Sequence, residues 1–260
     1  ASDVYKRQLS MALTSAPDIE TWIPTLTGEA VWQGPEIGFG GDVRRRDRYI
    51  PSCPCRMGES MDRIVEDLRD LSDAIGVSGF ESRVRDLISQ RVKAIADEVS
   101  VDPLGNLLAT KKGTRPKPTL LLMAHMDELG FIVSHLDERG FVRFEKLGGW
   151  DDRTLLGQPV RFETEGGIHE GLIGTKPPHL QKPDEKEKVV HSEDMFADIG
   201  CSSAEEVRSL GIDIGSPFTI FHPFRLVGSE RALGKALDDR VGCAVLIDVL
   251  RRLRRVRHKA

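Results

Sequence analysis

The spacing of apolar residues predicts helices in three parts of the chain. The first helix is predicted from apolar residues that share one helical face, Ile64, Leu68, Leu71 and Ile75. A second stripe lies between residues 84 and 95, after the glycine-containing turn at 76–79. The third stripe is formed by Val241, Ala244, Val245, Val249 and Leu253. These stripes predict three amphipathic helices with one face in a core.

Short apolar runs bounded by turn residues predict strands between the helices. The predicted strands span 99–101, 107–109, 131–133, 141–144, 160–163, 168–173 and 218–221. Two hairpins are predicted, one from 131–133 and 141–144 and one from 160–163 and 168–173, because each pair flanks a turn that contains glycine. Ser202 or Ser203 with Glu205 or Glu206 predicts a helix start with a capping box. The pattern therefore predicts an α/β fold that is interrupted by a β-rich region at residues 131–227.

The run from Leu120 to Glu128 contains five apolar residues followed by His125 and Asp127. A continuous apolar run of this length predicts a strand buried on both faces of a parallel sheet. Residues two apart on a strand share a face, so His125 and Asp127 are predicted to lie together at the carboxyl end of the strand. Open α/β sheets bind their ligands at that end. Glu128 would point to the opposite face and is given no ligand role.

Histidine followed two residues later by aspartate has two interpretations. A neutral imidazole binds zinc or cobalt, and the carboxylate can orient the ring. The alternative is a satisfied histidine beside a helix-capping aspartate. Asp238 and Asp239, just before the third helix, are interpreted either as a carboxylate that bridges two metal ions or as a cap at the helix N-terminus. His179 is predicted to be a surface histidine.

Composition and charge exclude several classes of protein. The formal net charge of -4 gives no general attraction to nucleic acid. The basic run at 251–259 could bind nucleic acid, complement a helix C-terminus, or be a non-native end. Four cysteines without a CxxC pair, no signal pattern and no apolar stretch of ~20 residues predict a cytoplasmic protein that binds no membrane.

Six segments, in this order along the chain, together resemble metallopeptidase family forty-two, the tetrahedral di-metal aminopeptidases that include deblocking and glutamyl aminopeptidases. They are residues 71–81, 102–109, 124–133, 171–180, 198–215 and 234–249. The resemblance covers about residues 57–255. It implies a phosphorylase/hydrolase-like α/β catalytic domain and an inserted β-barrel-like dimerisation domain.

The resemblance also implies the domain boundaries. The first and second parts of the catalytic domain would be residues 57–130 and 228–260, and the dimerisation domain would be residues 131–227. Residues 1–56 match nothing in the family and show no sustained period, so they are predicted to be disordered or non-native. The family assembles dimers into a hollow dodecamer, which implies a homo-oligomer.

The roles of three residues follow from the resemblance. His125 would be a ligand of one metal, Asp127 the active-site carboxylate that orients His125, and Asp238 the bridge between two divalent ions, zinc or cobalt. The Asp238–Asp239 peptide would be cis. The implied reaction is hydrolysis of the N-terminal residue from peptide substrates by a metal-bound water, with a glutamate as general base.

The chain departs from the family pattern after Asp238. The family adds a Glu-Glu pair, then an aspartate and a histidine, and no Glu-Glu pair follows Asp238 here. We therefore expect an incomplete catalytic domain, little or no activity and an exposed apolar sheet edge. Two alternatives stay open: a glycosidase-type hydrolase that uses Asp127 and Asp238, and a non-catalytic assembly module.

Overall fold

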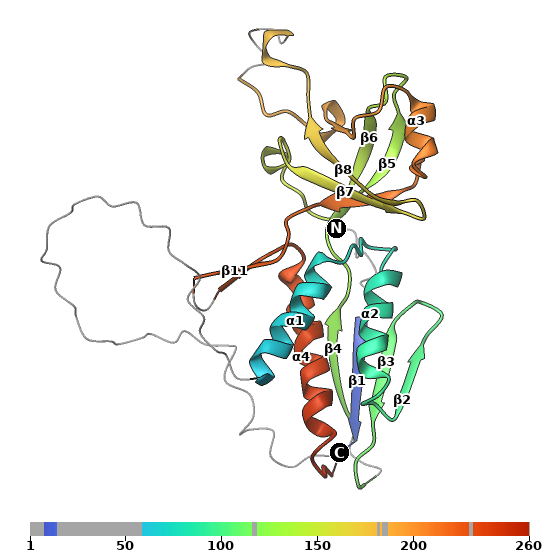
Figure 1. Ribbon diagram of the computed structural model, residues 1–260, viewed down its shortest axis with the longest axis vertical. Helices are drawn as coiled ribbons and strands as arrows, with labels where there is room; N and C mark the ends of the chain where they lie inside the picture. Colours follow the sequence, from blue (N-terminus) through green and yellow to red (C-terminus); the bar gives the residue numbers. More distant parts are fainter. Residues whose placement is uncertain are drawn as a thin grey trace, which may run out of the picture.

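The computed structural model describes residues 8–14, 59–115, 119–180, 183, 187–228 and 231–259. It has two lobes, an α/β lobe and a β-barrel, joined by two crossings of the chain (Figure 1). The elements of the α/β lobe are β1 (Gln8–Thr14), α1 (Glu59–Asp73), α2 (Ser82–Val92), β2 (Glu98–Val101), β3 (Leu107–Lys111), β4 (Thr119–His125) and α4 (Leu237–Leu253). No helix in these described residues is long and apolar enough to cross a membrane.

The sheet of the α/β lobe has the strand order β2-β3-β1-β4. Strand β1 pairs parallel to β3 and antiparallel to β4, so the sheet is mixed. The three helices α1, α2 and α4 form one core with the sheet, and α4 packs on β4. This core contains Leu71, Val84, Ile88, Leu107, Ala124 and Ile247. The first two helices and the strands at 99–101 and 107–109 lie where the sequence predicted them.

The prediction that β4 is buried on both faces of a parallel sheet is wrong. Leu120, Leu122 and Ala124 pack on or into the helical core, whereas Leu121 and Met123 are 55% and 57% exposed. The described helices cover one face of the sheet, so the alternate residues of β4 face solvent. An all-apolar run does not distinguish these two faces because every residue in it is apolar.

Two further elements differ from the sequence prediction. Residues 8–14 form β1, where no element was predicted, because the alternation from Leu9 to Leu13 is too short to stand out. The other residues of 1–56 lie outside the described part of the chain. On α4 the buried residues include Cys243, Ala244, Ile247 and Leu250. The predicted stripe is therefore wrong in part, since Val241 and Val245 are 43% and 39% exposed.

The second lobe is a closed barrel of six strands in the order β10-β5-β6-β9-β8-β7. Both predicted hairpins are confirmed, as β5–β6 and β7–β8, and the predicted strand at 218–221 is β10. The strands are β5 (Gly130–Leu136), β6 (Val142–Leu147), β7 (Pro159–Thr164), β8 (Gly167–Gly174), β9 (Phe196–Asp198) and β10 (Pro217–Ile220). Phe131, Phe144, Phe162 and Phe218 pack against one another inside it.

Short elements complete the barrel lobe and the return to the α/β lobe. The predicted capping box is present at α3 (Ala204–Ser209): Glu206 N donates to Ser203 Oγ, and Ser202 N donates to Glu206 Oε2. The 3₁₀ helices are η2 (Asp152–Thr154), η3 (Pro178–Leu180) and η4 (Ser192–Asp194). A two-stranded hairpin of β11 (Arg225–Val227) and β12 (Arg231–Leu233) precedes α4.

Candidate metal centre

His125, Asp127 and Asp238 lie together where β4 ends and α4 begins. His125 Nδ1 lies 3.0 Å from Asp127 Oδ1, and His125 Nε2 lies 3.2 Å from Asp238 Oδ1. The His125 ring is mostly buried and Asp127 is buried, whereas the side chain of Asp238 is 94% exposed. The buried Asp127 therefore contacts Nδ1 of the ring, and Nε2 faces the solvent-exposed carboxylate of Asp238.

Ser78 extends this chain of polar contacts, and no local sequence pattern indicated its role. Its hydroxyl donates to Asp127 Oδ2, the oxygen that does not face His125. Ser78 lies in the turn that follows α1, and the sequence pattern there indicated only a break between two helices. The contacts therefore run from Ser78 through Asp127 and His125 to Asp238, across three distant segments of the chain.

The two aspartates in the first turn of α4 have different contacts, and the capping interpretation holds for Asp239. Asp239 Oδ1 accepts a hydrogen bond of 3.0 Å from Gly242 N and so caps the regular part of the helix. Asp238 contacts His125 instead. Both residues have non-helical backbone angles, and the peptide between them is cis, as the family resemblance implies.

Gly242 is the residue that allows Asp239 to approach the helix so closely. A Cβ atom at this position would lie 2.4 Å from Asp239 Oδ1. Real Cβ atoms do not approach an oxygen so closely, so a larger residue would displace the capping carboxylate. The glycine thus belongs to the local structure that separates the roles of the two aspartates.

The donor set at this place fits a divalent metal. Zinc binds histidine nitrogen and carboxylate oxygen at about 2.0–2.2 Å, which places two ligands of one tetrahedral shell roughly 3.3 Å apart. His125 Nε2 and Asp238 Oδ1 have nearly this separation. A carboxylate at Nδ1 fixes the tautomer that leaves Nε2 unprotonated. Within the described residues, no group of three or more potential ligand side chains is arranged to hold a metal ion.

Cys243 contacts the backbone of His125 but does not supply a metal ligand. Its Sγ donates a 3.4 Å hydrogen bond to the carbonyl oxygen of His125. Burial raises the pKa of the Cys243 thiol to about 12, so it stays protonated at neutral pH. The thiol therefore acts as a packed neighbour that supports the end of β4.

Glu128, which was predicted to have no ligand role, is buried, and both of its carboxylate oxygens have partners away from His125. Both carboxylate oxygens accept hydrogen bonds of 2.8 Å from Lys235 Nζ. Burial lowers the pKa of Lys235, while the charge of Glu128 opposes that shift. No local sequence pattern could reveal this pair, because its members are 107 residues apart.

The other candidate groups lie apart from this centre. His179 is exposed in η3, as predicted for a surface histidine. In the basic run, Arg251 pairs with Asp67, and Arg252 pairs with Asp248. These ion pairs favour a structural role for that part of the run over nucleic-acid binding.

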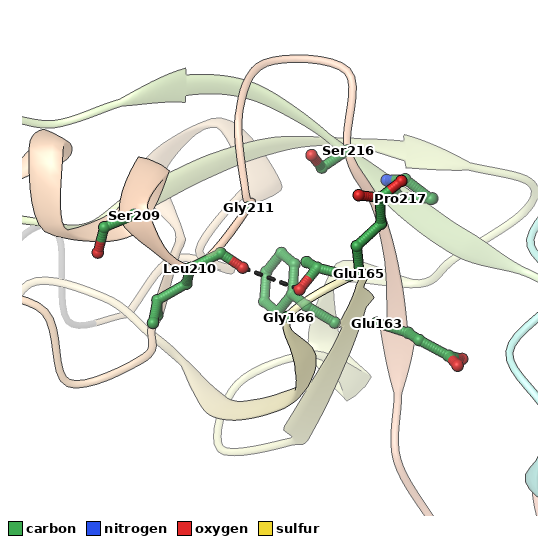
Figure 2. A pocket seen from close by; sticks show the side chains of 10 residues that line it. Glu163, Glu165, Gly166, Ser209, Leu210, Gly211, Ser216 and Pro217 are labelled. Atoms are coloured by element: carbon green, nitrogen blue, oxygen red, sulfur yellow. Dashed lines mark hydrogen bonds between the residues drawn. The ribbon is translucent and has the colours of Figure 1, made fainter.

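A cavity of about 430 Å³ lies in the barrel lobe rather than at the centre. Figure 2 shows it between the turn that joins β7 to β8 and the segment from α3 to β10, where Thr164 Oγ1 donates to Leu210 O at 2.8 Å. Glu163 and Glu165 line it, and none of the three predicted site residues does. The cavity and the candidate centre are separate features.

Known proteins match this chain in both sequence and fold. Relatives include FrvX of Escherichia coli, with 37% identity, and the lysyl aminopeptidase of Pyrococcus furiosus, with 36% identity. Each alignment covers 72% of this chain, and 52% and 54% of the two relatives. The chain therefore spans about half the length of the curated relatives that it matches.

Solved structures agree with the sequence comparison. The TET aminopeptidase of a marine-sediment Thaumarchaeota archaeon superposes with a TM-score of 0.69 and 40% identity, over 74% of this chain and 54% of that one. The TET1 peptidase of Pyrococcus horikoshii, described as assembling into a tetrahedron or a large octahedral shell, gives a TM-score of 0.62 and 32% identity, over 75% and 56%.

A family model also matches this chain. The model for M42 glutamyl aminopeptidase matches residues 105–260, which include all three residues of the candidate centre. This match spans more than half of the chain, and the relatives above exceed 30% identity over most of it. The chain therefore belongs to the M42 glutamyl aminopeptidase family.

Proposed function

We propose that this chain carries part of the metal site of a di-metal aminopeptidase that removes N-terminal residues from peptides. His125 and Asp238 would hold the ions, with Asp238 shared between them, and Asp127 would orient His125. The observation that carries the proposal is the 3.2 Å separation of His125 Nε2 and Asp238 Oδ1, with Asp127 behind the ring. Zinc and cobalt are the divalent ions that suit these donors.

The residues present would each have a defined task in such a site. Two bound divalent ions would supply a hydroxide at neutral pH and polarise the scissile carbonyl. Asp127 Oδ1 lies 3.0 Å from Nδ1 and would orient the imidazole, so that Nε2 would present its lone pair to an ion. Asp238 is open to solvent, and its two carboxylate oxygens can reach two different partners. The general base and the remaining ligands are not among these residues.

Metal binding by His125 and its dependence on the ring can be measured directly. Zinc or cobalt binding is titrated by calorimetry for the unchanged chain, His125→Ala and the control His179→Ala, whose histidine is exposed in η3. His125→Ala should weaken binding by more than the roughly 10–100-fold that loss of an outer partner costs, and His179→Ala should leave it unchanged. Equal effects of the two substitutions would refute the assignment.

We infer that the 260-residue chain alone has little aminopeptidase activity, because His125 and Asp238 supply only part of two metal shells. Hydrolysis of aminoacyl-p-nitroanilides is followed with added zinc or cobalt. Substantial metal-dependent turnover would overturn this inference. Metal dependence also separates a peptidase from a glycosidase, since a pair of carboxylates cleaves sugars without a metal.

The barrel, within residues 131–227, is proposed to mediate homo-oligomerisation. Support comes from the P. horikoshii TET1 peptidase, whose described assembly is a closed shell of many copies. If the barrel alone carries the contact, the chain should sediment as a dimer even where it binds no metal. A monomer at all concentrations would exclude the assembly-module interpretation.

A further inference from the structure

Glu128, next to Asp127 in the sequence, lies in a buried cluster of charged side chains with Lys235 and Arg240. Besides the two contacts with Lys235 Nζ, Glu128 Oε1 accepts a 2.9 Å hydrogen bond from Gly76 N. Arg240 Nη2 lies 3.6 Å from the same oxygen, and the Arg240 side chain is fully buried. One carboxylate therefore faces three donors from two other segments of the chain.

Each of these partners lies close in sequence to a residue of the candidate centre. Glu128 follows Asp127, and Gly76 precedes Ser78 by two residues. Lys235 and Arg240 flank Asp238, three residues before it and two residues after it. The cluster thus joins the backbones of the three segments that supply the polar contacts of the centre.

The same cluster is fixed to the helices and to the barrel. Lys235 Nζ also donates to Ala74 O at 2.8 Å, and Arg240 Nη1 donates to Leu71 O at the end of α1. Thr219 of β10 donates its hydroxyl to Leu129 O at 3.0 Å, next to Glu128. The packing at Gly76 is close, because a Cβ atom there would lie 2.6 Å from Val84 Cγ2 and 2.7 Å from Arg240 Nη2.

We propose that Glu128, Lys235 and Arg240 form a clasp that positions Asp238 and Asp127 relative to His125. These residues would act through the backbone segments that carry the centre and not as ligands, so they are positioning residues. The part of the proposal that concerns metal ligands rests on the proposed function, whereas the mechanical coupling of the three segments does not. Without the carboxylate, the segments around Ser78 and Asp238 lose their common anchor.

The test compares two buried carboxylates that are each held by two cations. Glu128→Gln keeps the shape of the side chain and removes its charge. The matched control is Asp67→Asn, since Asp67 is also buried and pairs with Arg91 and Arg251, but contacts no segment of the centre. Backbone hydrogen exchange is measured by mass spectrometry on peptides that cover residues 76–79 and 236–242, together with cobalt affinity by calorimetry.

We expect Glu128→Gln to accelerate exchange in both peptides at least about tenfold and to weaken cobalt binding about 10–100-fold. Asp67→Asn should leave the cobalt affinity unchanged. It should accelerate exchange in the two peptides no more than its loss of global stability accounts for. The double variant Glu128→Gln/Lys235→Met removes the charges of Glu128 and Lys235 and leaves Arg240 as it is in Glu128→Gln, so the comparison of the two variants measures the effect of the unbalanced Lys235 charge. It should fold as stably as Glu128→Gln or better, and still show fast exchange.

Three results decide the matter. Equal exchange in the Glu128 and Asp67 variants would overturn the clasp. Unchanged cobalt affinity with faster exchange would also overturn it, because the coupling would then not position the ligands. If the unchanged chain binds no cobalt, the proposed metal site fails, and hydrogen exchange alone decides whether the segments are coupled.

Discussion

Single hydrogen bonds at the candidate centre have consequences that can be measured one at a time. Ser78 donates to Asp127, which in turn faces Nδ1 of His125. The orientation of the imidazole therefore depends on a hydroxyl group that acts on the ring only through Asp127. Such outer partners commonly change metal affinity without contacting the ion.

Ser78→Ala should weaken zinc binding about tenfold, because Asp127 loses the donor that holds its second oxygen. The free energy of unfolding should fall by only about 1 kcal/mol, the usual contribution of one hydrogen bond. Competition with a chromophoric chelator measures the affinity. Ser209→Ala serves as control, since that exposed hydroxyl donates to Glu206 O far from the centre; an equal loss of affinity there would contradict the role of Ser78.

At the scale of secondary-structure elements, two elements bring the site residues together. Strand β4 delivers His125 at its carboxyl end, and the irregular first turn of α4 delivers Asp238. That turn depends on Asp239, which supplies the cap and so allows its neighbour to leave the helical path. A change at the cap should therefore affect both the helix and the site.

Asp239→Ala should lower the free energy of unfolding by about 1 kcal/mol, within the 0.5–2 kcal/mol typical of a lost N-cap. Chemical denaturation gives this value. In the control Asp248→Ala, α4 loses an i, i+4 ion pair with Arg252, which should cost only about 0.3–0.5 kcal/mol. A smaller loss for Asp239→Ala than for the control would show that the cap does not stabilise α4.

The sequence predicted those features of the elements that depend on local spacing. Helices α1 and α2, both hairpins and the capping box follow from periods of 3.6 or 2 and from turn residues. The His125–Asp127 proximity follows from the same period. The buried faces of β4 and α4 did not follow, because Leu121 and Val245 are as apolar as their buried neighbours. The ion pair of Glu128 with Lys235 requires tertiary structure and could not be predicted.

At the scale of the whole molecule, one face of the α/β sheet is left without a covering layer among the described elements. Leu108, Leu121 and Met123 are exposed on β3 and β4. Exposed apolar surface beside paired strands favours self-association. This face is therefore the part of the molecule whose substitution should most improve solubility.

Leu121→Glu should reduce aggregation, measured by light scattering, and change the free energy of unfolding by less than about 0.5 kcal/mol. Its neighbour Leu122 packs against the helical core on the other face. Leu122→Glu should therefore destabilise the fold by more than about 2 kcal/mol, since it places a charge in an apolar environment. Similar effects of the two substitutions would mean that the faces of β4 are not distinct.

The contact between Glu128 and Lys235 also bears on how the chain folds. Its two residues are 107 positions apart, and the whole barrel lies between them. Closing so long a loop costs conformational entropy and slows folding when the intervening chain is unfolded. Once the barrel has formed, its ends are already held near each other, and the remaining search is short. We expect the barrel to fold first. The folded barrel then holds the two crossing segments near each other, and the α/β lobe forms from them.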